Sequence, residues 1–288
     1  MSKLYWTPPG GGEIPLAPPT FVPQSDREGF DTIPAELFDA RAPYQDGATP
    51  LGGAFEPREI FLPLVITAES AEEMAALRRA VTRMFAPNRG IGVLRWTHDD
   101  GVNWSIRCEP SEGVAFQPLD RFASRRVRAE VTLQAKDPFW YDVSESTVET
   151  GMYSGGWSLP LLFPFSLGTA TGVVSVENAG DVACPCTITL TGPMIYPVIE
   201  NKTTGDAWGA DLALYPGEQL IVSSKFGAKS ATRFDPVTGT AINAFGSILP
   251  ESRWIELVPG ENRIGFTRSG EASRASMSVA WYNRYLGA

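Results

Sequence analysis

The segment Arg126–Trp140, with the sequence RVRAEVTLQAKDPFW, constrains the fold of this chain more than any other. Apolar residues occupy every second position from Val127 to Ala135, and this alternation is typical of a half-buried strand. The strand runs into a short motif that carries two aromatic rings: Asp137, Pro138, Phe139 and Trp140. Because proline cannot donate to a sheet ladder, strand pairing should end there. We predict that this motif is structural and lies at a domain junction.

Composition limits the classes of protein that fit the chain. Its 288 residues suffice for two domains with separate cores, and 43% hydrophobic with 20% charged residues is a globular balance. The formal net charge of -9 argues against a protein that coats nucleic acid or an anionic membrane, because both need a basic surface. We therefore expect no sequence-specific nucleic-acid binding, although a polyanion could slide past an acidic channel.

The sequence shows no targeting signal. The N-terminus has no signal-peptide-like apolar segment, and no run of about 18 apolar residues predicts a membrane span. Three cysteines are too few for a disulfide framework, and we expect buried apolar side chains in preference to a redox pair or metal site: Cys108, Cys184 and Cys186. The chain therefore fits a reducing cytoplasm as its place of assembly.

The first half of the chain predicts a β-sandwich-like domain with one packed α-helix, over residues 1–145. Residues 1–25 are rich in proline and glycine and predict an extended arm. Ser70 and Glu73 form a capping-box pattern, and apolar residues recur at helical spacing after them. This pattern predicts a helix over about residues 70–85 that packs on a sheet.

The second half predicts a separate antiparallel β-sandwich. Periodicity fades from residue 146 to residue 172, where Ser, Gly, Thr and Pro are frequent, so we predict a linker there. Residues 173–288 contain short candidate strands separated by turn signals and no helical pattern, which is typical of a sandwich. The predicted fold class is mainly β.

Catalytic chemistry finds little support in the sequence. His98 lies beside Asp99 and Asp100 and fits a hairpin turn better than a metal site, because the chain has no second histidine as a ligand. No serine lies in a nucleophile elbow, and no phosphate-binding or dinucleotide-binding motif is found. Glycoside hydrolysis needs only two carboxylates and stays open. We predict that the chain is not an enzyme and has no catalytic residue, cofactor or metal.

Sugar binding also stays open, because aromatic rings can stack on sugars. Trp281 falls in an alternating strand, so its ring is expected in the core. Trp208 lies in the segment TTGDAWGAD and is the better candidate for an exposed, sugar-stacking ring.

Several ordered segments resemble the distal tail protein (Dit) family of siphovirus-type phages. In the first half these are REIFLPLVI, SAEEMAALRRAVTRMF, DDGVNWSIRCEP and RVRAEVTLQAKDPFW. In the second half they are ENAGDVACPCTITLTGPMIYPVIENKTTG, LYPGEQLIV, WIELVPGENRIGF and MSVAWYNRYL. The resemblance covers nearly the whole chain from about Arg58, whereas the N-terminal PPGGG segment departs from it.

The resemblance implies a structural protein of the virion tail tip. In that family an N-terminal β-domain assembles as a hexameric ring that joins the tail tube to the baseplate hub, and DNA passes through its channel. A C-terminal galectin-like sandwich projects outward. The implied partners are further copies of the chain, the tail tube protein, the hub or tail-associated protein and the tape measure protein.

Two alternatives come from other classes of protein. The second domain could be a lectin-like adhesion module that recognises a host glycan, and this role is compatible with a connector. A polysaccharide hydrolase is the weaker alternative.

Overall fold

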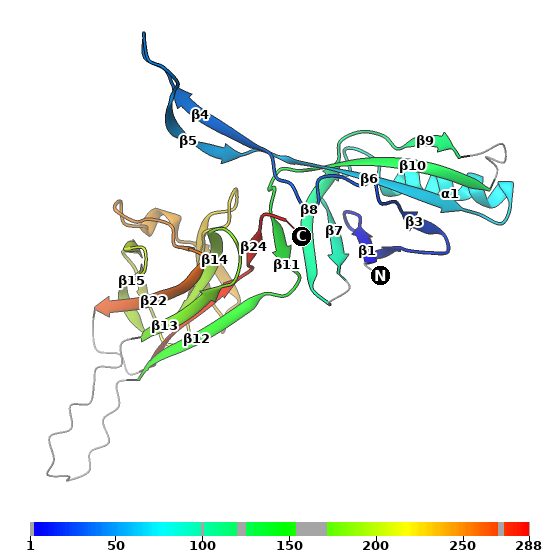
Figure 1. The fold of residues 1–288 in the computed structure, drawn as a ribbon. Coiled ribbons are helices and arrows are strands. Elements are labelled where there is room, and N and C mark those ends of the chain that lie inside the picture. The colour runs from blue at the N-terminus through cyan, green and yellow to red at the C-terminus, as the bar shows by residue number, and fades with distance from the viewer. Residues whose placement is uncertain (1–2, 99–100, 120–124, 154–171, 270–273, 288) are drawn as a thin grey trace, which may run out of the picture. The chain divides into compact units, whose positions relative to one another are not determined.

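The computed structural model describes residues 3–98, 101–119, 125–153, 172–269 and 274–287 (Figure 1). The chain forms two compact units, which are called unit 1 and unit 2 below. Unit 1 consists of Met1–Val143 and Tyr285–Ala288, and unit 2 consists of Ser144–Arg284. Unit 2 is therefore an insertion near the C-terminal end of unit 1, since the last four residues return to unit 1.

Unit 1 is built on a long antiparallel sheet. In spatial order its strands are β2 (Ile14–Leu16), β1 (Lys3–Thr7), β7 (Gly92–Thr97), β8 (Asn103–Pro110), β10 (Arg126–Ala135), β6 (Arg58–Thr67) and β3 (Phe21–Pro23). In addition, β9 (Ala115–Pro118) pairs with β10, and β11 (Trp140–Asp142) pairs with β8. Strands β8 and β10 pair only where Glu109 and Pro110 meet Gln134 and Leu133. The two halves of the sheet therefore join at one end and enclose a common core.

The pairing of β6 with β10 is called the ladder below. Its register runs from Arg58 opposite Ala135 to Thr67 opposite Arg126. In β10 every second residue from Val127 to Ala135 is buried, as its alternation predicts. These residues and the buried residues of β6 belong to one hydrophobic cluster, and the predicted closing strand of the domain is confirmed.

One helix, α1 (Ala71–Met84), follows β6. The Ser70 side chain accepts a hydrogen bond from the Glu73 N–H at 3.1 Å, and the Glu73 carboxylate accepts one from the Glu69 N–H at 2.8 Å. These bonds satisfy backbone donors at the helix start and confirm the predicted cap. Met74 and Val81 are buried, so the helix packs one face on the sheet and leaves the opposite face in solvent.

A hairpin distinct from the N-terminal residues 1–25 projects from unit 1 and is called the arm below. It consists of β4 (Ala35–Ala40) and β5 (Thr49–Phe55), which pair only with each other. Every residue of both strands is exposed. In Figure 1 the arm extends from one end of the ladder, and α1 lies toward the other end. The continuous chain from β5 through Glu56 and Pro57 into β6 fixes this geometry.

Unit 2 is an antiparallel sandwich with one core. The first sheet contains β12 (Ser146–Tyr153), β23 (Arg274–Trp281), β14 (Cys184–Thr191), β18 (Gln219–Ser223), β19 (Ser230–Asp235), β20 (Thr240–Asn243) and β21 (Glu256–Leu257). The second contains β13 (Gly172–Asn178), β22 (Gly260–Ser269), β15 (Met194–Asn201), β16 (Asp206–Gly209) and β17 (Ala213–Leu214). A short 3-10 helix spans Phe245–Ser247. The last strand, β24 (Arg284–Tyr285), belongs to the first-described sheet, that of unit 1, where it pairs with β11. The predicted mainly β fold with one α-helix and an antiparallel sandwich is confirmed for the described part of the chain.

Two expectations about segments are wrong. Residues 1–25 do not form an extended arm, because β1, β2 and β3 belong to the sheet and the Trp6 ring is fully buried against Phe85. Alternating apolar residues in β1 (Leu4 and Trp6) face the core and outweigh the nearby prolines. The predicted linker 146–172 begins with a strand, since β12 pairs with β23 along its whole length. Residues 154–171 lie outside the described residues.

Candidate functional site

The motif that closes the ladder contributes to the core. The Trp140 ring is fully buried, stacks on Phe30 with centroids 5.7 Å apart, and donates from Nε1 to the Phe30 carbonyl at 3.1 Å. Phe139 is 9% exposed and packs edge-on against Phe55 at the base of the arm, with centroids 5.4 Å apart. The Asp137 carboxylate accepts a hydrogen bond from the Tyr141 hydroxyl. These contacts place the motif, called the joint below, in the packing of unit 1, and its role as a domain junction stays a prediction.

A buried arginine holds this joint to two other parts of unit 1. Arg58 is fully buried and donates to the carbonyls of Pro138 at 2.7 Å, Gly29 at 3.0 Å and Phe30 at 2.9 Å, and also to that of Leu286. Burial lowers the pKa of Arg58 to about 10, so the guanidinium stays charged at neutral pH. Only the planar, five-donor head of arginine can serve so many carbonyls at once.

The histidine and the cysteines are held in structural contacts: His98 is exposed and stacks on aromatic rings, whereas the three cysteines are buried. The His98 ring packs against Trp96 and Trp104, with centroid distances of 5.8 and 6.3 Å. The adjacent Asp99 and Asp100 lie outside the described residues. Cys108, Cys184 and Cys186 are buried and form no disulfide, and burial raises the pKa of Cys108 and of Cys186 to about 12. Thiols of this kind are poor nucleophiles at neutral pH.

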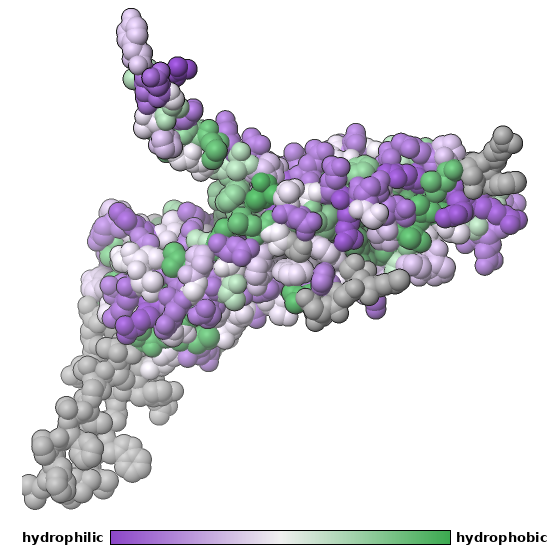
Figure 2. Space-filling model, viewed as in Figure 1, coloured by the Kyte–Doolittle hydropathy of each residue, from purple (hydrophilic) through white to green (hydrophobic). Residues whose placement is uncertain are grey.

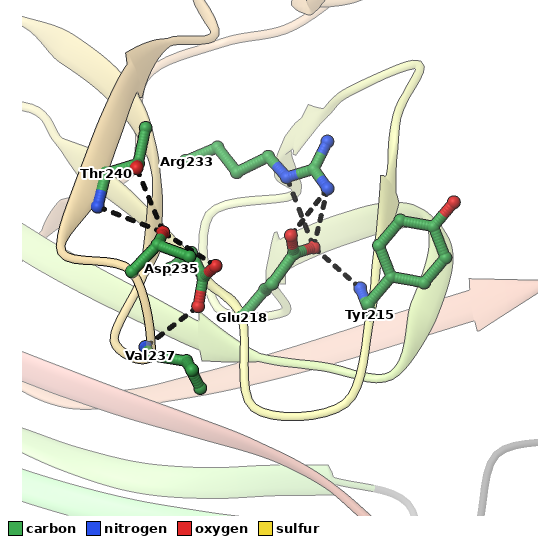
Figure 3. Close-up of polar contacts among 7 residues, drawn as sticks. Tyr215, Glu218, Arg233, Asp235, Val237 and Thr240 are labelled. Carbon is green, nitrogen blue, oxygen red and sulfur yellow. Dashed lines mark hydrogen bonds and ion pairs between the residues drawn. The ribbon is translucent and has the colours of Figure 1, made fainter.

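Carboxylates in unit 2 serve to fix turns (Figure 3). Arg233 Nη2 donates to both oxygens of Glu218, at 2.6 and 2.7 Å, and the Tyr215 N–H donates to the same carboxylate at 2.7 Å. Asp235 accepts from the Val237 N–H at 2.9 Å and from the Thr238 hydroxyl at 2.8 Å.

These bonds decide the protonation state of both carboxyl groups. The Arg233 guanidinium lowers the pKa of Glu218, and the Val237 N–H lowers the pKa of Asp235. A glycosidase needs one carboxyl group with a raised pKa as its general acid. Among the described residues, every carboxyl group with a resolved shift has a lowered pKa. These three carboxyl groups therefore do not have the raised pKa of a general acid.

The prediction that the Trp208 ring is exposed is wrong. Trp208 pairs with Ile199 in β16, and its ring is 1% exposed. Strand pairing turns the side chain into the core of the sandwich, where it packs against Trp254 at 6.4 Å. The exposed ring of this aromatic cluster is Phe245, which is 50% exposed and lies 5.9 Å from Trp254. Sugar binding by unit 2 stays a prediction, but the buried Trp208 ring cannot be the stacking residue.

The arm presents the most exposed apolar side chains of unit 1. The exposed fractions are 81% for Leu37, 67% for Leu51 and 44% for both Phe38 and Phe55, and Tyr44 near the tip is fully exposed. The register places Leu37 opposite Gly53, and a Cβ atom at Gly53 would lie 3.0 Å from Leu37 Cδ2. Leu37 lies opposite Gly53, and Gly53 and Phe55 are alternate residues of β5, so Leu37 and Phe55 lie on one face of the arm. Leu51 lies at a β-bulge, where the register shifts. Figure 2 shows the arm standing clear of the body of unit 1.

The exposed face of α1 borders a shallow groove of about 740 Å³, called the arginine groove below. It is lined by Ala76, Arg78, Arg79, Thr82, Arg83 and Phe116. The guanidinium of Arg78 lies 4.7 Å from the centroid of the Phe116 ring, which comes from β9. Arg78, Arg79 and Arg83 are exposed, and within the described residues none of them forms an ion pair. The groove is therefore basic on a chain whose net charge is -9.

Sequence reasoning missed both surfaces. The helical pattern does not distinguish the three arginines from other exposed helix residues, and it does not predict the arm. A signal for the arm existed in residues 35–55, where apolar and acidic residues flank a Pro/Gly-rich turn. In the part of the chain that the structure describes, no group of three potential metal ligands is found, and no helix is long and apolar enough to span a membrane.

Known structures share this fold. The SPP1 Dit protein (gp 19.1), described as a paradigm of the hub adsorption apparatus in phages that infect Gram-positive bacteria, superposes with a TM-score of 0.70 at 11% identity. The match covers 99% of this chain and 100% of that chain. Chains of the phage p2 baseplate in its activated conformation, with Sr and with Ca, give TM-scores of 0.56 and 0.55 at 9% identity, with both chains fully covered. No protein-family model and no curated protein matches the sequence. The resemblance to the distal tail family is confirmed at the level of the fold.

Proposed function

We propose that this chain is a structural component of a phage tail tip. Six copies form a ring through unit 1, the ring joins the tail tube to the baseplate hub, and DNA passes through its channel. The observation that carries the proposal is the match to SPP1 Dit over 99% of the chain with a TM-score of 0.70. Because the match extends over both units, it supports a shared role for the whole chain.

Two properties of the chain support a connector in preference to an enzyme. The described carboxylates with shifted pKa values are held in ion pairs or turns, and the described thiols are buried. Unit 1 also carries two exposed surfaces, the arm and the arginine groove, that a stable monomer does not need. The net charge of -9 is consistent with a channel that repels phosphates and does not retain DNA.

The mass of the purified full chain in solution tests the proposal. Light scattering should give six times the mass of one chain, and negative-stain images should show rings with six-fold symmetry. A chain that stays monomeric at high concentration, alone and with its tail tube partner, would contradict the ring.

A glycan array tests the lectin-like alternative on the same preparation. Binding by a monomer that never forms rings would favour the adhesion module. Binding by the ring would assign both roles to the chain, one to each unit.

A further inference from the structure

We propose that the arm of one copy of this chain occupies the arginine groove of the next copy. The inference rests on the proposed ring and names the contact that closes it. The occupant of the groove is therefore a second copy of the chain.

The arm needs a covering surface. An isolated two-stranded hairpin is at best marginally stable in water, and this one packs on the rest of unit 1 at its base, through Phe55 and Phe139. The side chains of Leu37 and Leu51, which are 81% and 67% exposed, are left to solvent. Exposed apolar faces and unpaired strand edges are typical of interaction surfaces.

The arginine groove offers a complementary floor. The ring of Phe116 and the side chain of Ala76 provide apolar contact area, and arginine stems add to it because their methylene groups pack on apolar surfaces. The contact of Arg78 with the Phe116 ring holds one guanidinium in place before any partner binds. A partner that brings both apolar groups and carboxylates would fill such a groove.

The charges of the two surfaces match. Residues 35–55 contain three acidic side chains, Glu36, Asp39 and Asp46, and one basic side chain, Arg41. The groove contains three arginines and no carboxylate among its lining residues. Guanidinium groups bind carboxylates through two parallel hydrogen bonds, which adds register as well as attraction.

The position of the two surfaces explains why the contact joins different copies. The arm leaves the ladder before Arg58, and α1 begins after Thr67, the other end of the same strand (Figure 1). Phe116 of the groove lies opposite Ala129, which pairs with Leu64 of β6, roughly 20 Å along the strand from Arg58. The arm leaves Arg58 in the opposite direction (Figure 1), so it points away from the groove of its own chain. A contact between two different surfaces at opposite ends of a subunit is heterologous, and it closes into a ring when the rotation between neighbours fits.

Charge reversal tests the contact in the full-length chain. The arm variant Glu36→Arg with Asp39→Arg, and the groove variant Arg79→Glu with Arg83→Glu, should each raise the concentration needed for half-assembly at least tenfold. Arg78 is left unchanged because it packs on Phe116. The chain that carries all four substitutions should assemble again, because opposite charges face each other once more. The matched control, Arg253→Glu with Arg263→Glu in unit 2, should assemble like the unmodified chain.

The outcomes distinguish a failure of the arm–groove contact from a failure of the ring itself. A ring that survives both double variants overturns the arm–groove contact and leaves the proposed function intact. A failure of the fourfold variant to recover, with unchanged melting temperatures, also overturns the contact. An unmodified chain that never assembles overturns the ring and the contact together.

Cross-linking gives an independent test of the occupant. A chain with Leu51→Cys and Ala76→Cys, treated with a short bismaleimide, should give covalently linked products of two to six chains on a denaturing gel, whereas each single variant should give none. The native thiols are buried and should not react in the folded protein. A product linked only within one chain would overturn the assignment of the groove to a second copy.

Discussion

The ladder and the arm are two antiparallel strand pairs whose strands β5 and β6 are consecutive in the chain, yet they differ in the burial of their side chains. Strand β5 ends at Phe55 and β6 begins at Arg58. In the ladder every second residue of β10 is buried in a common core, whereas every strand residue of the arm is exposed. Both pairs form the same kind of antiparallel backbone hydrogen bonds. Backbone pairing alone therefore does not show which surface is part of the fold and which is available to a partner.

The difference lies in what covers the apolar face. The ladder places its apolar residues under the second half of the sheet and α1, which removes them from water at a gain of roughly 25 cal/mol per Å². The arm carries leucine and aromatic side chains that unit 1 leaves uncovered. The ladder should therefore dominate the stability of the monomer, and the arm should matter for assembly. The four predictions below test this division, from the largest expected effect to the smallest.

Trp140→Ala should cause the largest loss of stability. The ring is fully buried at the end of the ladder and its Nε1 donates to the Phe30 carbonyl. Truncation leaves a cavity and removes one of the two hydrogen bonds that the Phe30 carbonyl accepts, at a cost of about 3–5 kcal/mol in the free energy of unfolding. Urea unfolding of the full chain measures it. An unchanged midpoint would show that the joint does not anchor unit 1.

Arg58→Lys should cost less, about 1–3 kcal/mol in the free energy of unfolding, because the charge is kept but buried carbonyls lose their donors. A lysine ammonium cannot span the carbonyls of Pro138, Gly29 and Phe30 that the guanidinium serves. The matched control is Arg126→Lys at the exposed end of β10, for which no change is expected. Equal midpoints for the two variants would contradict the role assigned to Arg58.

Asp26→Asn should lower stability slightly at neutral pH and leave it unchanged in strong acid, where the Asp26 carboxyl group is protonated. Arg128, on the half-buried side of β10, donates to Asp26 at 2.6 Å and lowers the pKa of this carboxyl group below 3.8. A lowered folded-state pKa stabilises the protein above pH 3.8, and that contribution is lost as the pH falls through the folded-state value. Thermal melts between pH 6 and pH 3 should show a shallower acid decline for the variant. A change at pH 7 as large as that of Arg58→Lys would contradict the ranking.

Leu37→Ala, on the arm, should leave the free energy of unfolding unchanged within about 0.5 kcal/mol, because the side chain is 81% exposed. The same variant should weaken ring formation, measured as the concentration for half-assembly. A large loss of monomer stability would show that the arm is part of the core of unit 1. Leu37→Ala and Trp140→Ala together compare the effect of an exposed arm residue on stability with that of a residue in the core of unit 1.

Local patterns allowed much of each unit to be predicted. The alternation in β10 and the cap at Ser70 depend on neighbours within a few residues, and both lie where they were expected. The segments that failed depend on distant partners instead. The buried Trp6 packs on Phe85, and the buried Trp208 packs on Trp254. Neither partner is close in sequence, so composition misled the interpretation of both.

The sequence by itself determined the mainly β class, the position of the helix and the strand β10 that ends before Pro138, because period, capping and proline act locally. Only the tertiary structure decided which apolar residues are covered. Arg58 acquired its role when the chain brought Phe30, Pro138 and Leu286 to one place. The arm became a surface because the sheet left it unpartnered. Burial is a property of the whole fold, and so is the surface that burial leaves exposed.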